Sequence, residues 1–178
     1  MQTHIAILRG INVGGKRKIL IADLRNILSE LGFSNVNTYA QSGNVVFEYK
    51  SHKNSELATK ITNQIHDKYG FDVPVIVITT AEFAEDFRSN PFVEKAEIGQ
   101  LHLTFLSEEP TDEKLTGINL LAHPPDEFRI IGKGVYLKCV NKYHQTKLSN
   151  NFFEKKLGVF ATTRNWKTVT KLVEMTKG

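Results

Sequence analysis

Six polar side chains, spread over three segments, have the chemistry that binds an anion. They are Arg9, Asn12, Lys16, Ser42, Asn44 and Arg164. Arginine and lysine supply positive charge, while serine and asparagine supply neutral hydrogen-bond donors, and proteins hold phosphates and carboxylates with such groups. We therefore predict a site for a small anion or a phosphorylated metabolite. These residue types do not indicate a reaction, so the sequence leaves enzymatic activity undecided.

The first segment resembles a phosphate-binding P-loop, because four residues separate Gly10 from Gly15 and Lys16 follows. In that motif a serine or threonine comes next and binds magnesium, but here the next residue is Arg17. The helix predicted after this loop also begins several residues too late for its first amides to face a phosphate. These differences disfavour a nucleotide P-loop and leave open a flexible loop that becomes ordered around an anion.

The other two segments also have structural explanations. Ser42, Gly43 and Asn44 fall in a predicted hairpin turn, where glycine and asparagine tolerate positive φ. Asn165 precedes the last predicted helix as an N-cap, and Arg164 beside it is suited to pairing with a carboxylate. The sequence leaves open whether the loop after the first strand and the hairpin turn lie at the same end of the sheet.

Other kinds of site find little support. The six histidines show no metal-ligand spacing, and there is no serine nucleophile elbow or recognisable catalytic triad. We predict no metal and no cofactor. Cys139 is the only cysteine, so no intrachain disulfide is possible and a reducing cytoplasm is expected. Its apolar neighbours indicate a buried, inert thiol.

The charge distribution supports a second hypothesis, a nucleic-acid-binding module. The net charge is +4, but from Lys133 onward ten basic residues face only two acidic ones. The strand pattern of the second half also suggests a less apolar sheet face, formed by His102, Thr104, Arg129, Tyr136 and Lys138. A third hypothesis is a protein-interaction or structural role without a small ligand. The oligomeric state is not indicated.

Hydrophobic periodicity predicts the order β-α-β-β-α-β twice. In the first half we expect strands at His4–Leu8, Val36–Ala40, Val45–Tyr49 and Val73–Ile78, and helices at Ile21–Leu31 and 57–70. In the second half we expect strands at Leu101–Leu106, Glu127–Ile131, Val135–Val140 and Val159–Thr162, and helices at Asp112–Leu121 and Leu148–Leu157. A short helix at Ala81–Ser89 connects the halves, and a helix at Trp166–Met175 follows the second.

This order predicts an α+β fold of two ferredoxin-like halves, residues 1–80 and 81–178, with an additional C-terminal helix. The first and fourth strands are apolar on both faces, at Ile5–Leu8 and Val75–Ile78. We therefore expect the two halves to pack together. No apolar run approaches the ~20 residues that span a bilayer, so no membrane partner is expected.

Three motifs resemble a single bacterial protein family, the domain-of-unknown-function 1697 family. They are Leu8-Arg9-Gly10-Ile11-Asn12-Val13-Gly14-Gly15, the stretch Thr38-Tyr39 with Gln41-Ser42-Gly43-Asn44-Val45-Val46-Phe47, and Thr163-Arg164-Asn165-Trp166 with Thr168-Val169 and Lys171-Leu172. The resemblance implies a cytoplasmic α+β protein built from two ferredoxin-like halves. It implies no activity, because the family has no established one. One departure is Ile21, where the family usually has methionine.

Overall fold

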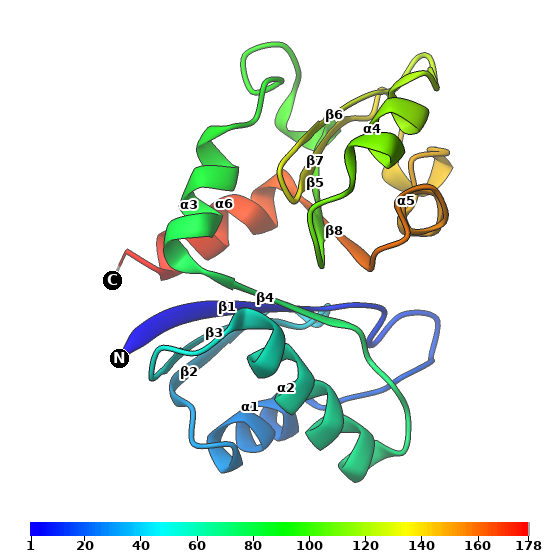
Figure 1. The fold of residues 1–178 in the computed structure, drawn as a ribbon. Coiled ribbons are helices and arrows are strands. Elements are labelled where there is room, and N and C mark those ends of the chain that lie inside the picture. Colours follow the sequence, from blue (N-terminus) through cyan, green and yellow to red (C-terminus); the bar gives the residue numbers. More distant parts are fainter. Residues whose placement is uncertain (178) are drawn as a thin grey trace. The chain divides into compact units, whose positions relative to one another are not determined.

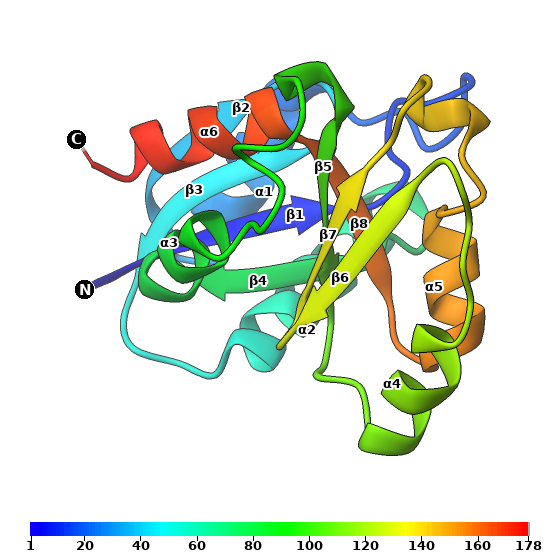
Figure 2. The same ribbon diagram turned by 90° about the horizontal axis from the view of Figure 1, so that it is seen from above.

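The computed structural model describes residues 1–177, which form two four-stranded sheets (Figures 1 and 2). The described residues contain eight strands and six α-helices, and neighbouring strands run antiparallel in both sheets. The fold is therefore α+β. The chain divides into two compact units, residues 1–85 together with the segment that begins at Leu172, and residues 86–171. The boundary expected at residue 80 stays a prediction.

The first unit contains a sheet with strand order β2-β3-β1-β4, and α1 and α2 lie on one face of it (Figure 1). Its elements are β1 (Gln2–Leu8), α1 (Ile21–Glu30), β2 (Ser34–Tyr39), β3 (Asn44–Tyr49), α2 (Asn54–Tyr69) and β4 (Val75–Thr79). Each helix buries one apolar side because its apolar residues recur every three or four positions, as Leu57, Ile61 and Ile65 do on α2. Gly70 ends α2 in the left-handed conformation, with its N–H bonded to the carbonyl of His66.

Burial of β1 on both faces is confirmed. Side chains alternate along a strand, so Ala6 and Leu8 point toward the helices and join their apolar cluster. Ile5 and Ile7 point to the opposite face and are also fully buried. β1 is a central strand with β3 on one side and β4 on the other. The central position of β1 in the sheet determines where the loop after its C-terminal end begins.

The second unit repeats the topology, with strand order β6-β7-β5-β8. Its elements are β5 (Leu101–Leu106), α4 (Asp112–Asn119), β6 (Glu127–Ile131), β7 (Gly134–Lys138), α5 (Asn150–Leu157) and β8 (Ala161–Asn165), with short 3-10 turns at Ile98–Gln100 and Tyr143–Gln145. The remaining helices, α3 (Thr80–Arg88) and α6 (Trp166–Met175), each contain a boundary between the two units.

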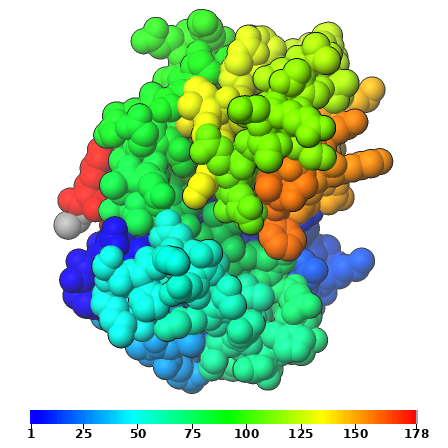
Figure 3. All heavy atoms as spheres, viewed as in Figure 1, coloured from blue at the N-terminus to red at the C-terminus, as the bar shows by residue number. Residues whose placement is uncertain are grey.

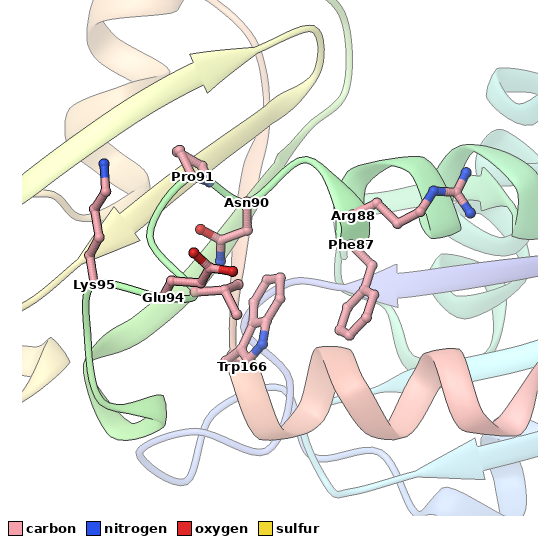
Figure 4. Close-up of a pocket in the computed structure, with 8 residues that line it drawn as sticks. Phe87, Arg88, Asn90, Pro91, Glu94, Lys95 and Trp166 are labelled. Atoms are coloured by element: carbon pink, nitrogen blue, oxygen red, sulfur yellow. The ribbon is translucent and has the colours of Figure 1, made fainter.

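The two faces of the second sheet have different coverings. One face packs against α4 and α5 through an apolar cluster that includes Leu137, Cys139 and Phe153. On the other face the Tyr136 hydroxyl donates a 2.8 Å hydrogen bond to the carbonyl of Asp86, at the end of α3. The segment after α3 is therefore part of this unit, and together with the end of α3 and Trp166 it lines a pocket (Figure 4).

The predicted elements are confirmed in order, and most boundaries agree within one or two residues. β8 differs most, because it spans Ala161–Asn165 and not Val159–Thr162. Its extent is set by pairing with β5, from Leu106 opposite Ala161 to His102 opposite Asn165. Asn165 caps α6 as expected, since its Oδ1 accepts a 2.9 Å hydrogen bond from the N–H of Thr168.

Among residues 1–177, no helix is long and apolar enough to cross a lipid bilayer.

Candidate functional site

The loop between β1 and α1 projects from the first unit as a small hairpin-like arm with an isolated antiparallel bridge between Val13 and Lys16 (Figure 3, the lighter blue atoms on the right). The backbone N–H of Asn12 donates to the carbonyl of Arg17 (3.2 Å), and that of Lys16 donates to the carbonyl of Val13 (3.1 Å). Gly14 and Gly15 form the tip, with φ values of 59° and 73°. Two successive positive φ values define a type I′ turn, which explains the pair of glycines.

Asn12 holds the base of this arm. Its Nδ2 donates to the carbonyl of Ile19 (3.0 Å) and to that of Gln41 (2.9 Å), while its Oδ1 accepts from the N–H of Ile19 (3.0 Å). Both amide hydrogens of Asn12 are therefore used within the protein. The bond to Gln41 ties the arm to the β2–β3 turn, 29 residues later in the chain.

Gly43 brings the β2–β3 turn against the start of the arm. Its carbonyl accepts a 2.9 Å hydrogen bond from the N–H of Leu8, and its φ is 82°. A β-carbon at this position would lie 2.7 Å from Cδ1 of Ile11 and 2.9 Å from Cβ of Leu8. The loop after β1 and the hairpin turn thus lie at the same end of the sheet, which answers the question that the sequence left open.

Asn44 and Ser42 stabilise the turn from within. Asn44 is fully buried, and its Nδ2 donates to the carbonyl of Tyr39 (2.9 Å) and to the hydroxyl of Ser42 (3.1 Å). Ser42 is half-buried beside it. These contacts give both residues a structural role, and contact between them and a ligand stays a prediction.

The arm carries a concentrated positive charge. Lys16, Arg17 and Lys18 are exposed, Arg9 at its base is half-buried, and no acidic residue occurs before Asp23. A β-carbon at Gly10 would lie 3.2 Å from Nη1 of Arg17, so this guanidinium lies against the backbone at the base of the arm. Sequence reasoning missed Arg17 and Lys18, although the unbroken run of three cations was a visible signal.

The helix that follows the arm does not complete a P-loop. α1 begins at Ile21, five residues after Lys16, and Leu20 at its N-cap makes no side-chain capping bond. In a P-loop the lysine stands at the start of the helix, so that the helix amides also face the phosphate. The arm therefore presents its cations on a hairpin and not at a helix terminus.

Arg164 belongs to the second unit, where it lies on β8 with only 8% of its surface exposed. Its Nη1 donates to the hydroxyl of Thr162 (3.0 Å) and to the carbonyl of Thr163 (2.9 Å). Burial lowers the pKa of Arg164 to about 10, because the charged form loses hydration, while Tyr143 acts in the opposite direction. The guanidinium remains charged at neutral pH.

The polar face expected on the second sheet is not formed. In the antiparallel ladder, directly paired residues share a face, and His102 pairs with Leu137 while Tyr136 pairs with Leu103 and Arg129. His102 and Thr104 therefore point to one side, and Arg129, Tyr136 and Lys138 point to the other. His102, Thr104 and Tyr136 are also buried. This interpretation was wrong because it used composition without the strand register.

The basic C-terminal residues are distributed over separate elements. Lys133 lies in the β6–β7 turn, Lys155 and Lys156 lie in the last turn of α5, and Lys167 and Lys171 lie on α6. α5 and the beginning of α6 lie on opposite sides of the second sheet (Figures 1 and 2). In addition, Lys138 pairs with Glu127 at 3.0 Å, and Arg164 is buried. This distribution counts against a single basic surface for nucleic acid.

Metal and thiol chemistry find no support in the part of the chain that the structure describes. No group of three or more histidine, cysteine, aspartate or glutamate side chains there is arranged to hold a metal ion. Cys139 is buried, and burial, assisted by the charge of Asp126, raises the pKa of its thiol to about 11. A thiol that stays protonated at neutral pH is a poor nucleophile, which agrees with the inert role expected for Cys139.

The fold and the arm define an α+β protein with two antiparallel sheets and a basic hairpin loop. The chain belongs to the family described as "Protein of unknown function (DUF1697)", whose model matches residues 1–136. It is similar to a solved structure described as that of the conserved bacterial protein SP0830 from Streptococcus pneumoniae, with 24% identity, 98% of each chain covered and a TM-score of 0.79. At this identity the likeness shows the fold alone. No curated protein matches the chain.

Proposed function

We propose that this protein binds a small anion, such as a phosphorylated metabolite, through the basic arm of its first unit. The observation that carries the proposal is the arm itself. Three exposed cations, Lys16, Arg17 and Lys18, follow the two-glycine tip in sequence with no acidic residue nearby, and Asn12 fixes the base of the arm that carries them. A fixed base reduces the ordering that a bound anion would require.

The proposed contacts divide the residues into two groups. Arg9, Lys16, Arg17 and Lys18 supply the charge, and the backbone amides of the tip supply neutral donors for phosphate oxygens. Asn12, Ser42 and Asn44 hold the arm and the adjoining turn in place through a network of internal hydrogen bonds. Arg164 belongs to the other unit, and the proposal does not depend on it.

Two further proposals concern the fold of each unit and the location of the protein in the cell. We propose that each unit is ferredoxin-like, which the order β-α-β-β-α-β and the central position of β1 and β5 support. We also propose a cytoplasmic location, which is supported by the presence of one buried cysteine and no second one.

Isothermal titration of the full chain with inorganic phosphate, pyrophosphate and a sugar phosphate tests the proposal. We expect saturable binding that weakens at least about tenfold, or about 1.4 kcal/mol, when Lys16, Arg17 and Lys18 are all changed to glutamine. Arg9→Lys should also weaken binding, because lysine keeps the charge but loses the planar fork of donors.

The matched control removes the same charge from exposed positions of the second unit, by changing Lys114, Lys142 and Lys147 to glutamine. This variant should bind as the unmodified protein does. Equal weakening in both triple variants, or no weakening in the arm variant, would contradict the proposal. Oligonucleotide binding at two salt concentrations provides a further comparison, because a nucleic-acid surface loses affinity steeply as salt rises. Preferential, salt-sensitive oligonucleotide binding would favour the nucleic-acid hypothesis instead.

A further inference from the structure

The strand β6 forms one edge of the second sheet, and its outer side pairs with no other strand among residues 1–177 (Figure 2). Its residues pair with β7 in an unbroken register, from Glu127 opposite Lys138 to Ile131 opposite Gly134. Neither proline nor glycine occurs in β6. A regular, unpaired edge of this kind presents backbone N–H and C=O groups that can pair with another strand.

The hairpin turn between β6 and β7 shows which backbone groups point outward. The turn has two residues, and the positive φ of Gly132 (58°) at its first position indicates type II′. In such a hairpin the flanking pair, Ile131 and Gly134, is hydrogen-bonded, and hydrogen-bonded pairs then alternate along the ladder. The N–H and C=O groups of Phe128 and Ile130 therefore point away from β7.

The Arg129 side chain supports this assignment. Its Nη1 donates a 2.9 Å hydrogen bond to the carbonyl of Phe128, an acceptor that the ladder leaves unused. Among the described residues, no backbone group outside the β6–β7 hairpin bonds to the N–H or C=O of Ile130. Ile130 therefore offers one donor and one acceptor to a partner strand.

β2 occupies the equivalent edge position in the first sheet, but its pairing is irregular. The register of β2 on β3 shifts between Ser34 and Asn37, and Asn35 has a φ of 49°. Bulges and irregularities of this kind disrupt strand pairing and protect an edge from association. Of these two equivalent edges, β6 is the one that is regular enough to accept another strand.

A second copy of β6 fits this edge in one antiparallel register. A two-fold symmetric pair places one residue opposite itself on the axis. With Arg129 on the axis, two guanidinium groups would lie directly opposite each other, which destabilises a sheet. With Phe128 on the axis, Ile130 would face Asp126 of the second copy. The N–H of Asp126 is already used, because it donates to the carbonyl of His123 (2.9 Å). Ile130 on the axis avoids both conflicts.

The register centred on Ile130 is complementary in charge. It places Glu127 opposite Lys133 of the second copy, the two-fold axis repeats this pair, and no residues of like charge lie opposite each other. The side chains of Glu127 and Lys133 are both exposed. Within its own chain Glu127 uses Oε1 for its 3.0 Å contact with Lys138, so Oε2 is available to Lys133 of the second copy.

We infer that β6 is an interaction surface for a second copy of this chain, which pairs with it antiparallel about Ile130. The two copies of the second sheet then form one continuous sheet. It is held by the N–H···O bonds that the two Ile130 residues exchange and by the two pairs of Glu127 with Lys133. So short an edge contact makes a weak dimer. The surface belongs to the second unit, and the inference does not rest on the proposed function.

Sedimentation equilibrium of the full chain over a range of concentrations up to about 1 mM measures this association. We expect a monomer–dimer equilibrium with a dissociation constant below about 1 mM. Lys133→Glu places two carboxylates opposite each other in the dimer and should weaken it at least about tenfold. Lys114→Glu makes the same charge change on α4 and should leave the association unchanged. A monomer throughout the range, or an equal effect of the two variants, would overturn the inference.

Mixing two variants tests the register itself. Glu127→Lys alone should also weaken the dimer, because it places two lysines opposite each other. When Lys133→Glu and Glu127→Lys proteins are mixed in equal amounts, they should form a heterodimer, since each opposing pair again carries unlike charges. A mixture that associates no more strongly than its separate components would rule out this register.

The main-chain contact has its own test. Ile130→Pro removes an N–H that points outward, so the β6–β7 ladder keeps its hydrogen bonds. This variant should lose the dimer, whereas Ile130→Val, which keeps the N–H, should retain it. Circular dichroism shows whether each variant is folded, and the mixing experiment decides if Ile130→Pro does not fold. Dimer formation by folded Ile130→Pro would contradict the pairing. Loss of the dimer when Lys16, Arg17 and Lys18 are changed to glutamine would place the contact at the arm and overturn the inference.

Discussion

Gly43 is the residue at which the β2–β3 turn and the basic arm approach each other most closely. We expect Gly43→Ala to destabilise the protein by about 2–4 kcal/mol, because alanine is strained at a φ of 82° and its β-carbon would lie 2.7 Å from Ile11. Gly14→Ala is the control, since Gly14 also has positive φ but no atom lies within 4 Å of its added β-carbon. Gly14→Ala should cost only about 1 kcal/mol, measured by urea unfolding. Equal losses would show that the close approach is absent.

Two buried histidines should make the protein sensitive to acid. Burial lowers the pKa of His4 and of His102 below the ordinary value of 6.5. Below pH 6.5 the unfolded chain binds protons that the folded chain resists, so the free energy of unfolding falls as the pH is lowered. His4→Phe with His102→Phe should flatten this dependence, because phenylalanine can replace each ring in its stack on Phe47 or Tyr143.

Urea unfolding at pH 7.5 and pH 5.0 measures this effect. The exposed His144 serves as the control, and His144→Gln should retain the slope of the unmodified protein. A double variant that loses as much stability at pH 5.0 as the unmodified protein would exclude His4 and His102 as the cause.

At the residue scale, the sequence predicted where the polar loop and the turn lie, but it did not predict which hydrogen bonds their side chains make. Glycine, asparagine and lysine types predicted a polar loop and a turn. They did not show that the Asn12 side chain would donate hydrogen bonds to the carbonyls of Ile19 and Gln41, because Gln41 lies 29 residues later in the chain. Asn90 directly follows the predicted helix at Ala81–Ser89, and the sequence did not show that its Nδ2 would be buried without a hydrogen-bond partner among the described residues, because that depends on the path of the following segment.

At the scale of single elements, α6 depends on its first residue. Trp166 is 5% exposed and stacks on Phe87 of α3. We expect Trp166→Ala to lower the free energy of unfolding by about 3–5 kcal/mol, because it removes a large buried ring and leaves a cavity. Phe160→Ala is the matched control, since this aromatic side chain is 57% exposed, and its loss should cost less than about 0.5 kcal/mol. Comparable losses in the two variants would contradict a packing role for Trp166.

The element scale also shows what periodicity can predict. Helices such as α2 were predictable because their apolar residues repeat at helical spacing, and the glycine that ends α2 is visible in the sequence. The limits of β8 were not, because Thr162, Thr163 and Arg164 become a strand through pairing with β5. Polar strands of this kind depend on tertiary pairing more than on their own composition.

At the scale of the whole molecule, the packing of the two halves stays a prediction. Its motive is that Ile5 and Ile7, on the β1 face opposite the helices, are fully buried. If the halves pack together, both should unfold in one transition. Trp166 fluorescence reports on the second unit, and amide exchange of β1 reports on the first. Coincident urea midpoints would agree with this prediction, and clearly separate midpoints would contradict it.

Burial of β1 has its own test. Ile7→Asp places a charge at a fully buried position. Its direct partners on the neighbouring strands, Asn44 and Ile76, are uncharged. An unpaired buried charge is costly enough to prevent folding. Thr3→Asp, at a partly exposed position of the same strand, is the control and should fold. Circular dichroism and size-exclusion chromatography distinguish the two outcomes, and a native-like Ile7→Asp protein would show that the second face of β1 is open.

An NMR titration of the full ¹⁵N-labelled chain with inorganic phosphate shows whether the basic arm binds an anion. The tip amides of Gly14 and Gly15 are the neutral donors nearest to the exposed cations in sequence. If the arm binds phosphate, these amides should shift most, the shifts should saturate, and they should disappear when Lys16, Arg17 and Lys18 are changed to glutamine. Largest shifts at residues outside the arm, or shifts that grow linearly without saturation, would contradict it.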